Sequence, residues 1–347
     1  MSLLRKTFAD IQGFKHEFIS NLMVKPPGHE VHELICWLVG RPRDHGAILF
    51  FDVGDSTGTI QVVAMKSKTL SWTELRTLTA ESSLRLWGRL DVNKGNAEII
   101  LGRSTIISKS TRILHPEIRK LDMAILANNN TDKVLASRHI YLRNPLILAL
   151  NLYRSRFFAV IHAWFKGNNF VDISAPLITP SILYEPNSAV HLANLKSSKT
   201  LFLSQCAGFY LEAAAHAHER VYNLGPSFRN ESRTNRHLME YWHIKAELCS
   251  GKINDIIDLV EVFLQDISEA LAPFTKELTS LMGSKPPHIQ TPFKRVTYIQ
   301  ALTLLNQQEI EISFGENISK SAEDLLTKMF GGPGNHSHIA SVPKTTA

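Results

Sequence analysis

Between residues 31 and 109, apolar and polar residues alternate in short segments that are separated by Gly, Asp, Ser and Asn clusters. Alternation with a period of two, bounded by turn residues, is typical of β-strands. Five such strands in so short a stretch predict a small barrel. We expect an OB-fold at residues 30–110, and another small all-β domain is the alternative. The segments read HELICWLVGR, AILFFDVGD, TIQVVAM, LRLWGRLD and AEIILGR.

The second part of the chain has a helical pattern in place of alternation. Residues 111–137 are polar and irregular and predict a linker, whereas apolar residues recur at helical spacing from Pro145 onward. Further segments predict a strand broken at Pro176, a helix, a two-stranded hairpin and an amphipathic helix. Helices mixed with antiparallel strands indicate an α+β domain at residues 138–347, and residues 1–29 form an N-terminal extension. The later segments read FVDISAPLI, FYLEAAAHAHER, RVYNLGPSFRNE with HLMEYWHIKAEL, and NDIIDLVEVFLQDISEAL.

The hairpin predicted around residues 228–247 combines an apolar back with a strongly polar front. In its first strand Arg229 and Glu231 alternate onto one face, and Tyr241 lies on the polar face of the second strand. An arginine offers a planar fork of donors to phosphate oxygens, a carboxylate accepts from an amino-substituted base, and an aromatic ring stacks on a purine. These residues predict a nucleotide cradle. From spacing alone, an edge hairpin with solvated charges is an equal alternative.

Composition narrows the class of protein. The chain has 347 residues, which is enough for two domains. Its net charge of +6 and its pI of about 9.1 permit a nucleic-acid partner without requiring one. Its cysteines, Cys36, Cys206 and Cys249, are too few and too far apart for a disulfide framework or a CxxC zinc site, and they favour a reducing cytoplasm. We find no apolar run that approaches the roughly 18 residues needed to span a bilayer, and we expect no membrane contact.

The hairpin residues also carry a resemblance. F-R-x-E followed by R-H-L-x-E-[FY] resembles motif 2 of the class II aminoacyl-tRNA synthetases, and R-H-L-x-E-Y-W is most similar to the asparaginyl branch of the aspartyl/asparaginyl/lysyl subgroup. The resemblance implies that Arg229 holds the α-phosphate and the substrate carboxylate, and that Glu231 meets the adenine amino group. It further implies that Arg236 and His237 reach the outer phosphates of ATP and that Tyr241 stacks on adenine.

The resemblance extends upstream of the hairpin. In the subgroup an N-terminal OB domain binds the tRNA anticodon, and Phe50 and Gln61 fall where the family stacks on and hydrogen-bonds an anticodon base. A packing role in the barrel is the alternative for Phe50, and Gly54 replaces a family arginine. FVDISAPLIT resembles motif 1, which builds the homodimer interface around its proline, here Pro176. The resemblance therefore implies a homodimer with tRNA as its partner.

The region that binds the amino acid in the family departs from the family pattern. LFLSQCAGFYLEA resembles Y-L-T-x-S-x-Q-L-Y-L-E-A, but Cys206 and Gly208 stand in place of the family Ser and Gln. In the family that Gln contacts the substrate's amino group. Either another group binds the amino acid in this chain, or the pocket no longer binds an amino acid. Glu185 falls where the family has an acidic residue near the bound amino acid, although Pro186 and Asn187 replace its usual turn.

The sequence ends on IASVPKTTA, which resembles the V-x-x-Y-P-K-x segment of the family. In the family the acidic Mg²⁺ ligands and motif 3, G-x-G-x-x-R, follow this segment, so we expect ATP as a substrate and assign no metal ligand. The resemblance implies an asparagine–tRNA ligase-like protein that activates asparagine with ATP and transfers it to tRNA. We expect this chain to be incomplete or degenerate and not to charge tRNA alone. The alternatives are a non-catalytic paralogue that binds RNA, nucleotide or a protein, and a related adenylate-forming amide synthetase.

Overall fold

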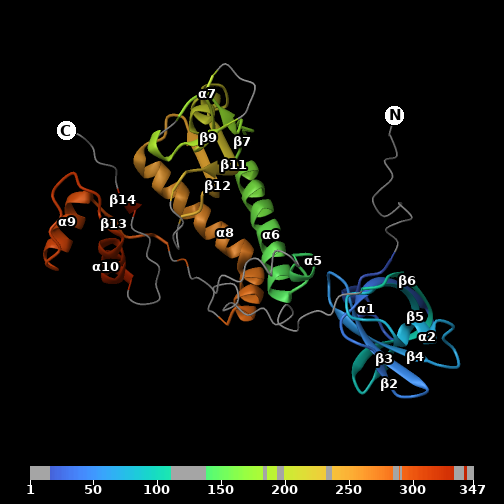
Figure 1. Cartoon of the computed structure of the whole chain (residues 1–347). Helices are drawn as coiled ribbons and strands as arrows, with labels where there is room; N and C mark the ends of the chain where they lie inside the picture. The colour runs from blue at the N-terminus through green and yellow to red at the C-terminus, as the bar shows by residue number, and fades with distance from the viewer. Residues whose placement is uncertain are drawn as a thin grey trace, which may run out of the picture. The chain divides into compact units, whose positions relative to one another are not determined.

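The structure is a computed structural model, and it divides into two compact units, Met1–Ala149 and Leu150–Ala347, each described here by itself (Figure 1). The predicted linker at residues 111–137 and the first part of the N-terminal extension lie outside the described residues. The structure describes residues 16–110, 138–182, 186–193, 199–231, 237–283, 289, 291–331 and 340–341.

The first unit contains a closed β-barrel. Its strands follow the order β1-β5-β6-β4-β3-β2, and β1 also pairs with β3, which closes the sheet on itself. All pairs are antiparallel except β4 with β6. This is the OB-fold that the alternation predicts. The elements are α1 (Ile19–Leu22), β1 (Val31–Leu38), β2 (Arg43–Asp44), β3 (Ile48–Gly54), β4 (Thr59–Met65), α2 (Trp72–Arg76), β5 (Ser83–Asn93) and β6 (Asn96–Ser108).

Alternation along the strands fills the barrel. In β1, Leu34, Cys36 and Leu38 are buried and their neighbours face outward, and in β3 Phe51 is buried whereas Phe50 faces outward. The outward position of Phe50 removes the alternative that it is a core residue. Helices α1 and α2 complete the core with Ile19, Leu22, Trp72 and Leu75.

The pairing of β5 with β6 shifts register twice, and one of the shifts lies beside Trp87. Trp87 pairs with Arg103, and because the next pair skips a residue of β6, Gly102 is left over as a bulge. The strands approach so closely here that a Cβ on Gly88 would lie 2.7 Å from the carbonyl oxygen of Ile100. The bulge shifts the alternation of β6 by one residue and so turns Arg103 to the outer face of the barrel, opposite Trp87.

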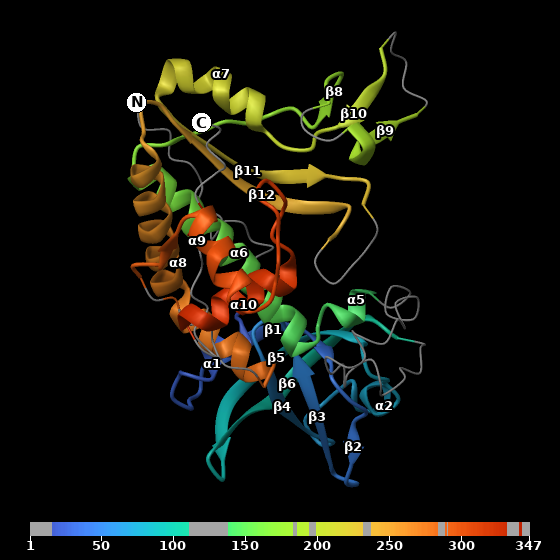
Figure 2. The same cartoon turned by 90° about the vertical axis from the view of Figure 1, so that its left-hand side faces the viewer.

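The second unit is built on the predicted hairpin. Strands β11 and β12 pair antiparallel, and the short strand β7 adds parallel to β11. Helices α6 and α8 pack on one face of this sheet, and α7 lies on the other (Figure 2). A second sheet has the order β8-β10-β9. The elements from the end of the first unit onward are α5 (Arg138–Tyr141), α6 (Pro145–Gly167), β7 (Val171–Asp172), β8 (Ile178–Thr179), the 3-10 helix η4 (Pro186–Ser188), β9 (Val190–Leu192), β10 (Leu201–Leu203), α7 (Gly208–His218), β11 (Arg220–Phe228), β12 (Glu240–Leu248) and α8 (Ile253–Leu281).

Aromatic side chains dominate the core beneath the hairpin. The ring of Phe165 in α6 stacks on Tyr222 of β11, with centroids 4.3 Å apart and planes at 12°. Phe158 of α6 contacts Trp242 of β12 at 4.7 Å between centroids. Burial of this face by α6 and α8 leaves the opposite face of the hairpin for α7 and for polar side chains. The mixture of helices and antiparallel strands confirms the predicted α+β class.

The last described part of the chain forms a small helical cluster. It contains β13 (Arg295–Val296), α9 (Tyr298–Asn306), α10 (Lys320–Gly331) and β14 (Ala340–Ser341), and β13 pairs parallel with β14. Arg295 pairs with Asp258 and Glu261 of α8, which ties β13 to that helix. Gln300, which stands where the family often has Glu, accepts from the Thr297 backbone N–H at 2.9 Å and completes a capping box for α9.

Helix α6 bears on the expectation that the chain makes no membrane contact. By length and composition alone it could cross a membrane, although we expected no run long enough. The core helix of a soluble protein passes the same test, and Ile161 and Phe165 of α6 lie in the core with Tyr222. Arg154 and Arg156 interrupt the apolar residues of α6, so the helix holds no unbroken apolar run of the expected length.

Candidate functional site

The open face of the hairpin carries a row of polar side chains. Cross-strand pairs place Ser227 opposite Tyr241, and Asn223 opposite Lys245. These positions alternate with Leu224 and the other residues that pack on α6 and α8, so they point to the opposite side of the sheet. Helix α7 covers the far end of this side, where Leu211 and Ala215 pack on Val221. The end near Ser227 and Tyr241 is left as the candidate site.

Arg229, Glu231 and His237 lie together beside this row. Nη1 of Arg229 is 3.7 Å from Oε1 of Glu231, and Nε2 of His237 is 3.9 Å from Oε2 of the same carboxylate. The side chains of Arg229 and Glu231 are 29% and 30% exposed, so a ligand can reach both.

The strand alternation predicted for Arg229 and Glu231 is wrong. Strand β11 ends at Phe228, and the Glu231 backbone N–H donates to the carbonyl of Arg229 in a tight turn. The Asn230 N–H donates to the carbonyl of Ser188 at 2.8 Å, outside the hairpin. The two side chains therefore meet because a turn brings them together, and that turn is held by a contact with η4 that alternation cannot reveal.

Tyr241 and His243 share one face of β12. The rings of Tyr241 and His243 lie 5.9 Å apart on β12. Burial lowers the pKa of His243 below its ordinary value, and the positive charges of Lys245 and Arg229 lower it further. On this face Nδ1 of His243 lies 3.4 Å from the Ser227 hydroxyl.

A rigid segment before α7 borders the face. The Gln205 side chain is buried and donates to the Ser188 hydroxyl at 3.2 Å, and the Ser204 carbonyl accepts from the Phe228 N–H at 3.0 Å. The thiol of Cys206 is buried and accepts from the Gly208 N–H at 3.2 Å. These bonds hold the N-terminus of α7 against the hairpin.

Lys245 and His243 are residues of this site that the sequence analysis did not select. Nζ of Lys245 lies 3.9 Å from Sγ of Cys206 and 3.6 Å from Oε1 of Glu247. Both residues follow Tyr241 at intervals of two along β12, so the alternation itself was the signal that could have found them. Gly208 is the buried first residue of α7, close to Cys206. Glu185 and Arg236 lie outside the described residues.

The predicted residues of the barrel lie on its outer surface. Phe50 pairs with Val63, and Asp52 pairs with Gln61, so Phe50 and Gln61 occupy diagonal positions on the outer side of β3 and β4. Both are half-buried. The ring of His45 meets Phe50 edge-on at 5.6 Å between centroids, which leaves a partly covered aromatic on this side of the barrel.

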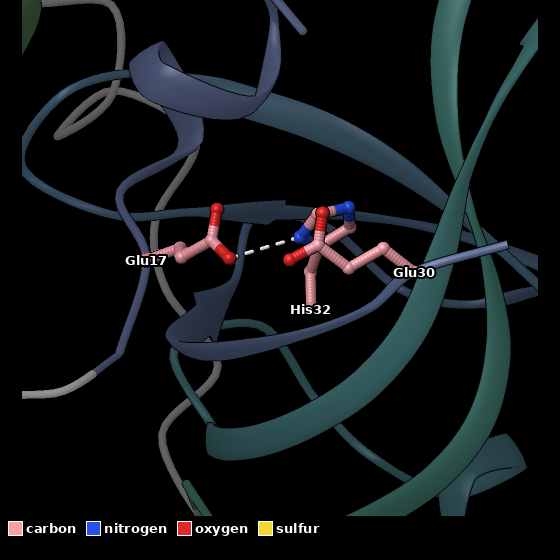
Figure 3. A group of neighbouring side chains, drawn as sticks. All are labelled: Glu17, Glu30 and His32. Carbon is pink, nitrogen blue, oxygen red and sulfur yellow. Dashed lines mark hydrogen bonds and ion pairs between the residues drawn. The ribbon is translucent and has the colours of Figure 1, made fainter. Parts of the chain in front are cut away.

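Among the described residues, one group of side chains has the spacing of a metal site. Glu17, Glu30 and His32 place potential ligand atoms within 4.8 Å of one another (Figure 3). Nδ1 of His32 lies 2.9 Å from Glu17, and Lys25 occupies the other oxygen of that carboxylate at 2.8 Å. Burial alone would raise the pKa of Glu17, but the hydrogen bonds from Lys25 and His32 lower it below its ordinary value. Both oxygens of the Glu17 carboxylate are therefore already engaged, by Lys25 and His32, and the Glu17 N–H donates to the carbonyl of Glu33 in β1.

Comparison with known protein families gives a match for each of the two parts of the chain. Residues 130–336 match the family of class II tRNA synthetases (D, K and N), and residues 34–121 match the OB-fold nucleic acid binding domain. The chain belongs to the class II tRNA synthetases. It is 28% identical to the asparagine–tRNA ligase of Thermococcus gammatolerans over 320 residues, which cover 89% of this chain and 71% of that relative. It is 30% identical to the asparagine–tRNA ligase of Desulforamulus reducens over 324 residues, which cover 90% of this chain and 72% of that relative.

Solved synthetase structures share the fold. The asparaginyl-tRNA synthetase of Pyrococcus horikoshii complexed with asparaginyl-adenylate aligns with a TM-score of 0.76 at 24% identity and covers 91% of this chain and 73% of that chain. The Entamoeba histolytica asparaginyl-tRNA synthetase in complex with asparaginyl-adenylate aligns with a TM-score of 0.72 at 23% identity, covering 92% and 73%. The predicted family, its OB-fold and its α+β class are confirmed, and this synthetase is asparagine–tRNA ligase-like.

Proposed function

We propose that the open face of the hairpin binds ATP and that the protein activates asparagine for transfer to tRNA. The observation that carries the proposal is that Ser227, Tyr241 and His243 share one side of β11 and β12, and that Arg229, which donates to the carbonyl of Met239, lies at the end of the same two strands. Arg229 presents a cation for the α-phosphate and the substrate carboxylate, and Tyr241 presents a ring for adenine. Glu231 accepts from the adenine amino group, and His237 reaches the outer phosphates together with Arg236.

The reaction served by these groups is attack of a carboxylate on the α-phosphorus with pyrophosphate as leaving group. Both reactants are anionic at this point, so a cation between them lowers their repulsion and holds the attacking oxygen in line. Arg229 fits this role because the main chain on either side of it is fixed. Its own N–H donates to the carbonyl of Met239 at 3.0 Å, and the next N–H donates to Ser188.

Magnesium ions accompany ATP in this proposal as part of the family chemistry. Among the described residues, the carboxylates beside the open face are Glu231 and Glu247, and each lies within 4.0 Å of a cationic nitrogen, from Arg229 and Lys245 respectively. Two carboxylates already matched with cations do not form an oxygen-rich Mg²⁺ site. We therefore assign no step to a metal held by these residues.

The barrel completes the proposal by binding the tRNA anticodon. Phe50 offers an outward aromatic face for a base, and Gln61 offers an amide from the neighbouring strand at a diagonal position. The three well-separated cysteines fit a cytoplasmic enzyme.

We also propose that the protein is a homodimer whose interface includes α6 and the segment around Pro176. Leu152 of α6 is 56% exposed, and Val171 of the short edge strand β7 is 39% exposed. Val171 also lines a hollow of about 480 Å³, together with Lys166 and Tyr222. A second copy would cover these apolar side chains and the edge of β7, which otherwise present a surface prone to association.

Equilibrium binding of ATP to the purified chain tests the nucleotide site. Arg229→Gln should weaken ATP binding by about 10- to 150-fold, because hydrogen bonds to charged groups each contribute about 1.5–3 kcal/mol. The matched control is Arg220→Gln, since Arg220 lies at the other end of β11 and donates to the carbonyl of Asn168 at 3.3 Å. If Arg229→Gln and Arg220→Gln bind ATP as the wild type does, the assignment is wrong.

A second candidate function is nucleotide binding without activation of asparagine. Gly208 has no side chain to contact a substrate amino group, and the cation of Lys245 lies 3.9 Å from the neighbouring Cys206. A cation at this end of the site repels the α-ammonium group of an amino acid and so disfavours its binding there. Pyrophosphate exchange that depends on asparagine favours the first function, and ATP binding without such exchange favours the second.

A further inference from the structure

The outer surface of the barrel carries a second aromatic group, on strands that hold neither Phe50 nor Gln61. Trp87 lies in the middle of β5, with Glu33 of β1 opposite it on one side and Arg103 of β6 opposite it on the other. Arg85 and Arg89 occupy the outward positions before and after Trp87. We call Arg85, Trp87, Arg89 and Arg103 the Trp87 face.

Two guanidinium groups lie close to the indole ring. Cζ of Arg103 lies 4.7 Å from the ring centroid of Trp87, and Cζ of Arg85 lies 5.9 Å from it. Glu33 holds Arg85 by an ion pair of 3.1 Å, and the side chain of Arg85 is still 42% exposed. The Trp87 face therefore combines a half-buried ring with three cations against one carboxylate.

The fold of the barrel explains how Arg103 comes to lie there. Without the bulge at Gly102, that glycine would stand opposite Trp87 and Arg103 would turn toward the core. Gly88 permits the close approach of the two strands at this point. The core of the barrel is filled by the alternate residues Leu84, Leu86 and Leu90, so folding requires none of the outward arginines.

An aromatic ring beside arginines is the chemistry that holds single-stranded nucleic acid, because bases stack on the ring and phosphates pair with the cations. The closed sheet places β6 and β4 between β5 and β3 on one side and β1 between them on the other, so the Trp87 face and Phe50 lie on strands that are not neighbours. The acidic pair of Asp91 and Glu98 bounds the face toward the β5–β6 turn. Phosphates are therefore attracted to the Trp87 end of these strands.

We propose that the Trp87 face is a second RNA-binding surface of the OB domain, which holds a single-stranded segment of tRNA outside the segment held at Phe50 and Gln61. This inference rests on the proposed binding of tRNA by the barrel. A strand that runs across the outer side of the barrel contacts both surfaces, so each surface contributes to affinity independently of the other.

The test measures binding of an unmodified tRNA(Asn) transcript to the full chain over a series of salt concentrations. Arg85→Gln combined with Arg103→Gln should reduce the slope of log K against log [salt] by about 1.4, since each phosphate contact of a single strand contributes about 0.7. Arg76→Gln is the matched control, because Arg76 lies in α2 and pairs with Asp44 at 2.6 Å. It should leave the slope unchanged.

The aromatic contribution is tested at Trp87 itself. Trp87→Ala should weaken tRNA binding by about 5- to 150-fold, and Trp87→Phe should restore most of the loss because phenylalanine still stacks. Thermal melts establish that each variant is folded before its affinity is compared.

The outcomes separate the two proposals. If Phe50→Ala weakens binding while the Trp87 and arginine variants keep wild-type affinity and slope, the second surface is wrong and the anticodon proposal stands. If the wild type binds no tRNA, both are wrong. If the variants lower only the melting temperature of the barrel, the Trp87 face is internal packing and the proposal is overturned.

Discussion

Replacing Gly88 by alanine should destabilise the barrel, and the structure gives the reason. The new Cβ would lie 2.7 Å from the carbonyl oxygen of Ile100 and closer still to the side chain of Ile99. Ile99 is 1% exposed and packed in the core, so neither neighbour can move without shifting β6. Overpacking of this kind costs about 1–3 kcal/mol.

Gly102 provides a matched control in the same bulge. A Cβ there would meet the carbonyl oxygen of Trp87 at 3.4 Å, which is an ordinary contact. Gly102→Ala should therefore be neutral or stabilise the protein by about 0.4–1 kcal/mol, because alanine restricts the unfolded chain. The two variants differ by the same single methyl group from the wild type, so their comparison isolates the steric effect.

Hydrogen exchange of the full chain, followed by mass spectrometry, measures the effect where it occurs. Peptides from β5 and β6 should exchange faster in Gly88→Ala, and the melting temperature of the barrel should fall by about 4–8 °C for each kcal/mol lost. Equal protection of these peptides in the Gly88 and Gly102 variants would refute the reasoning about the close approach.

Three further predictions concern the second unit. Folding lowers the pKa of His243 from its ordinary value of 6.5, so the unfolded chain binds a proton at a higher pH than the folded chain does. The contribution of His243 to stability is therefore constant above pH 6.5 and becomes destabilising as the pH falls below it. His243→Gln should flatten this decline in thermal melts, and an unchanged decline would contradict the reasoning. Tyr241→Ala should weaken ATP binding by about 5-fold or more whereas Tyr241→Phe keeps it, and equal affinities would exclude stacking. Leu152→Asp should convert the proposed homodimer to a monomer in sedimentation velocity, and a wild-type monomer at micromolar concentration would contradict the proposal.

Much of the fold could be read from local patterns. Alternation such as that of Leu34, Cys36 and Leu38 gave the barrel strands, because a half-buried strand must present every second residue to the core. The same rule placed Trp242 and Ile244 on the packed side of β12 and Tyr241 on the open side.

The features that the sequence did not reveal depend on contacts between distant segments. The turn after Phe228 is fixed by the bond from Asn230 to Ser188, and no local signal marks where β11 ends. The bulge at Gly102 arises from pairing with β5, so the position of Arg103 could not be predicted from β6 alone. Helix α8 continues through Pro273 to Leu281, beyond the predicted end, even though proline disfavours a helix interior.

Candidate site residues could be predicted from type and resemblance, but their grouping required the structure. Arg229, Glu231 and His237 lie together through a turn and not through strand alternation. Lys245 and His243 lie outside the family motif, so the resemblance gives them no role, although alternation along β12 places them on the same face as Tyr241.

The central claim is that ATP binds on the open side of β11 and β12, and a crystal structure of the chain with a non-hydrolysable ATP analogue tests it most directly. The account predicts that adenine stacks on the ring of Tyr241 and that the α-phosphate lies within hydrogen-bonding distance of the Arg229 guanidinium. A nucleotide bound anywhere else, including the α6 side of the sheet, with Arg229 and Tyr241 uncontacted, would contradict it.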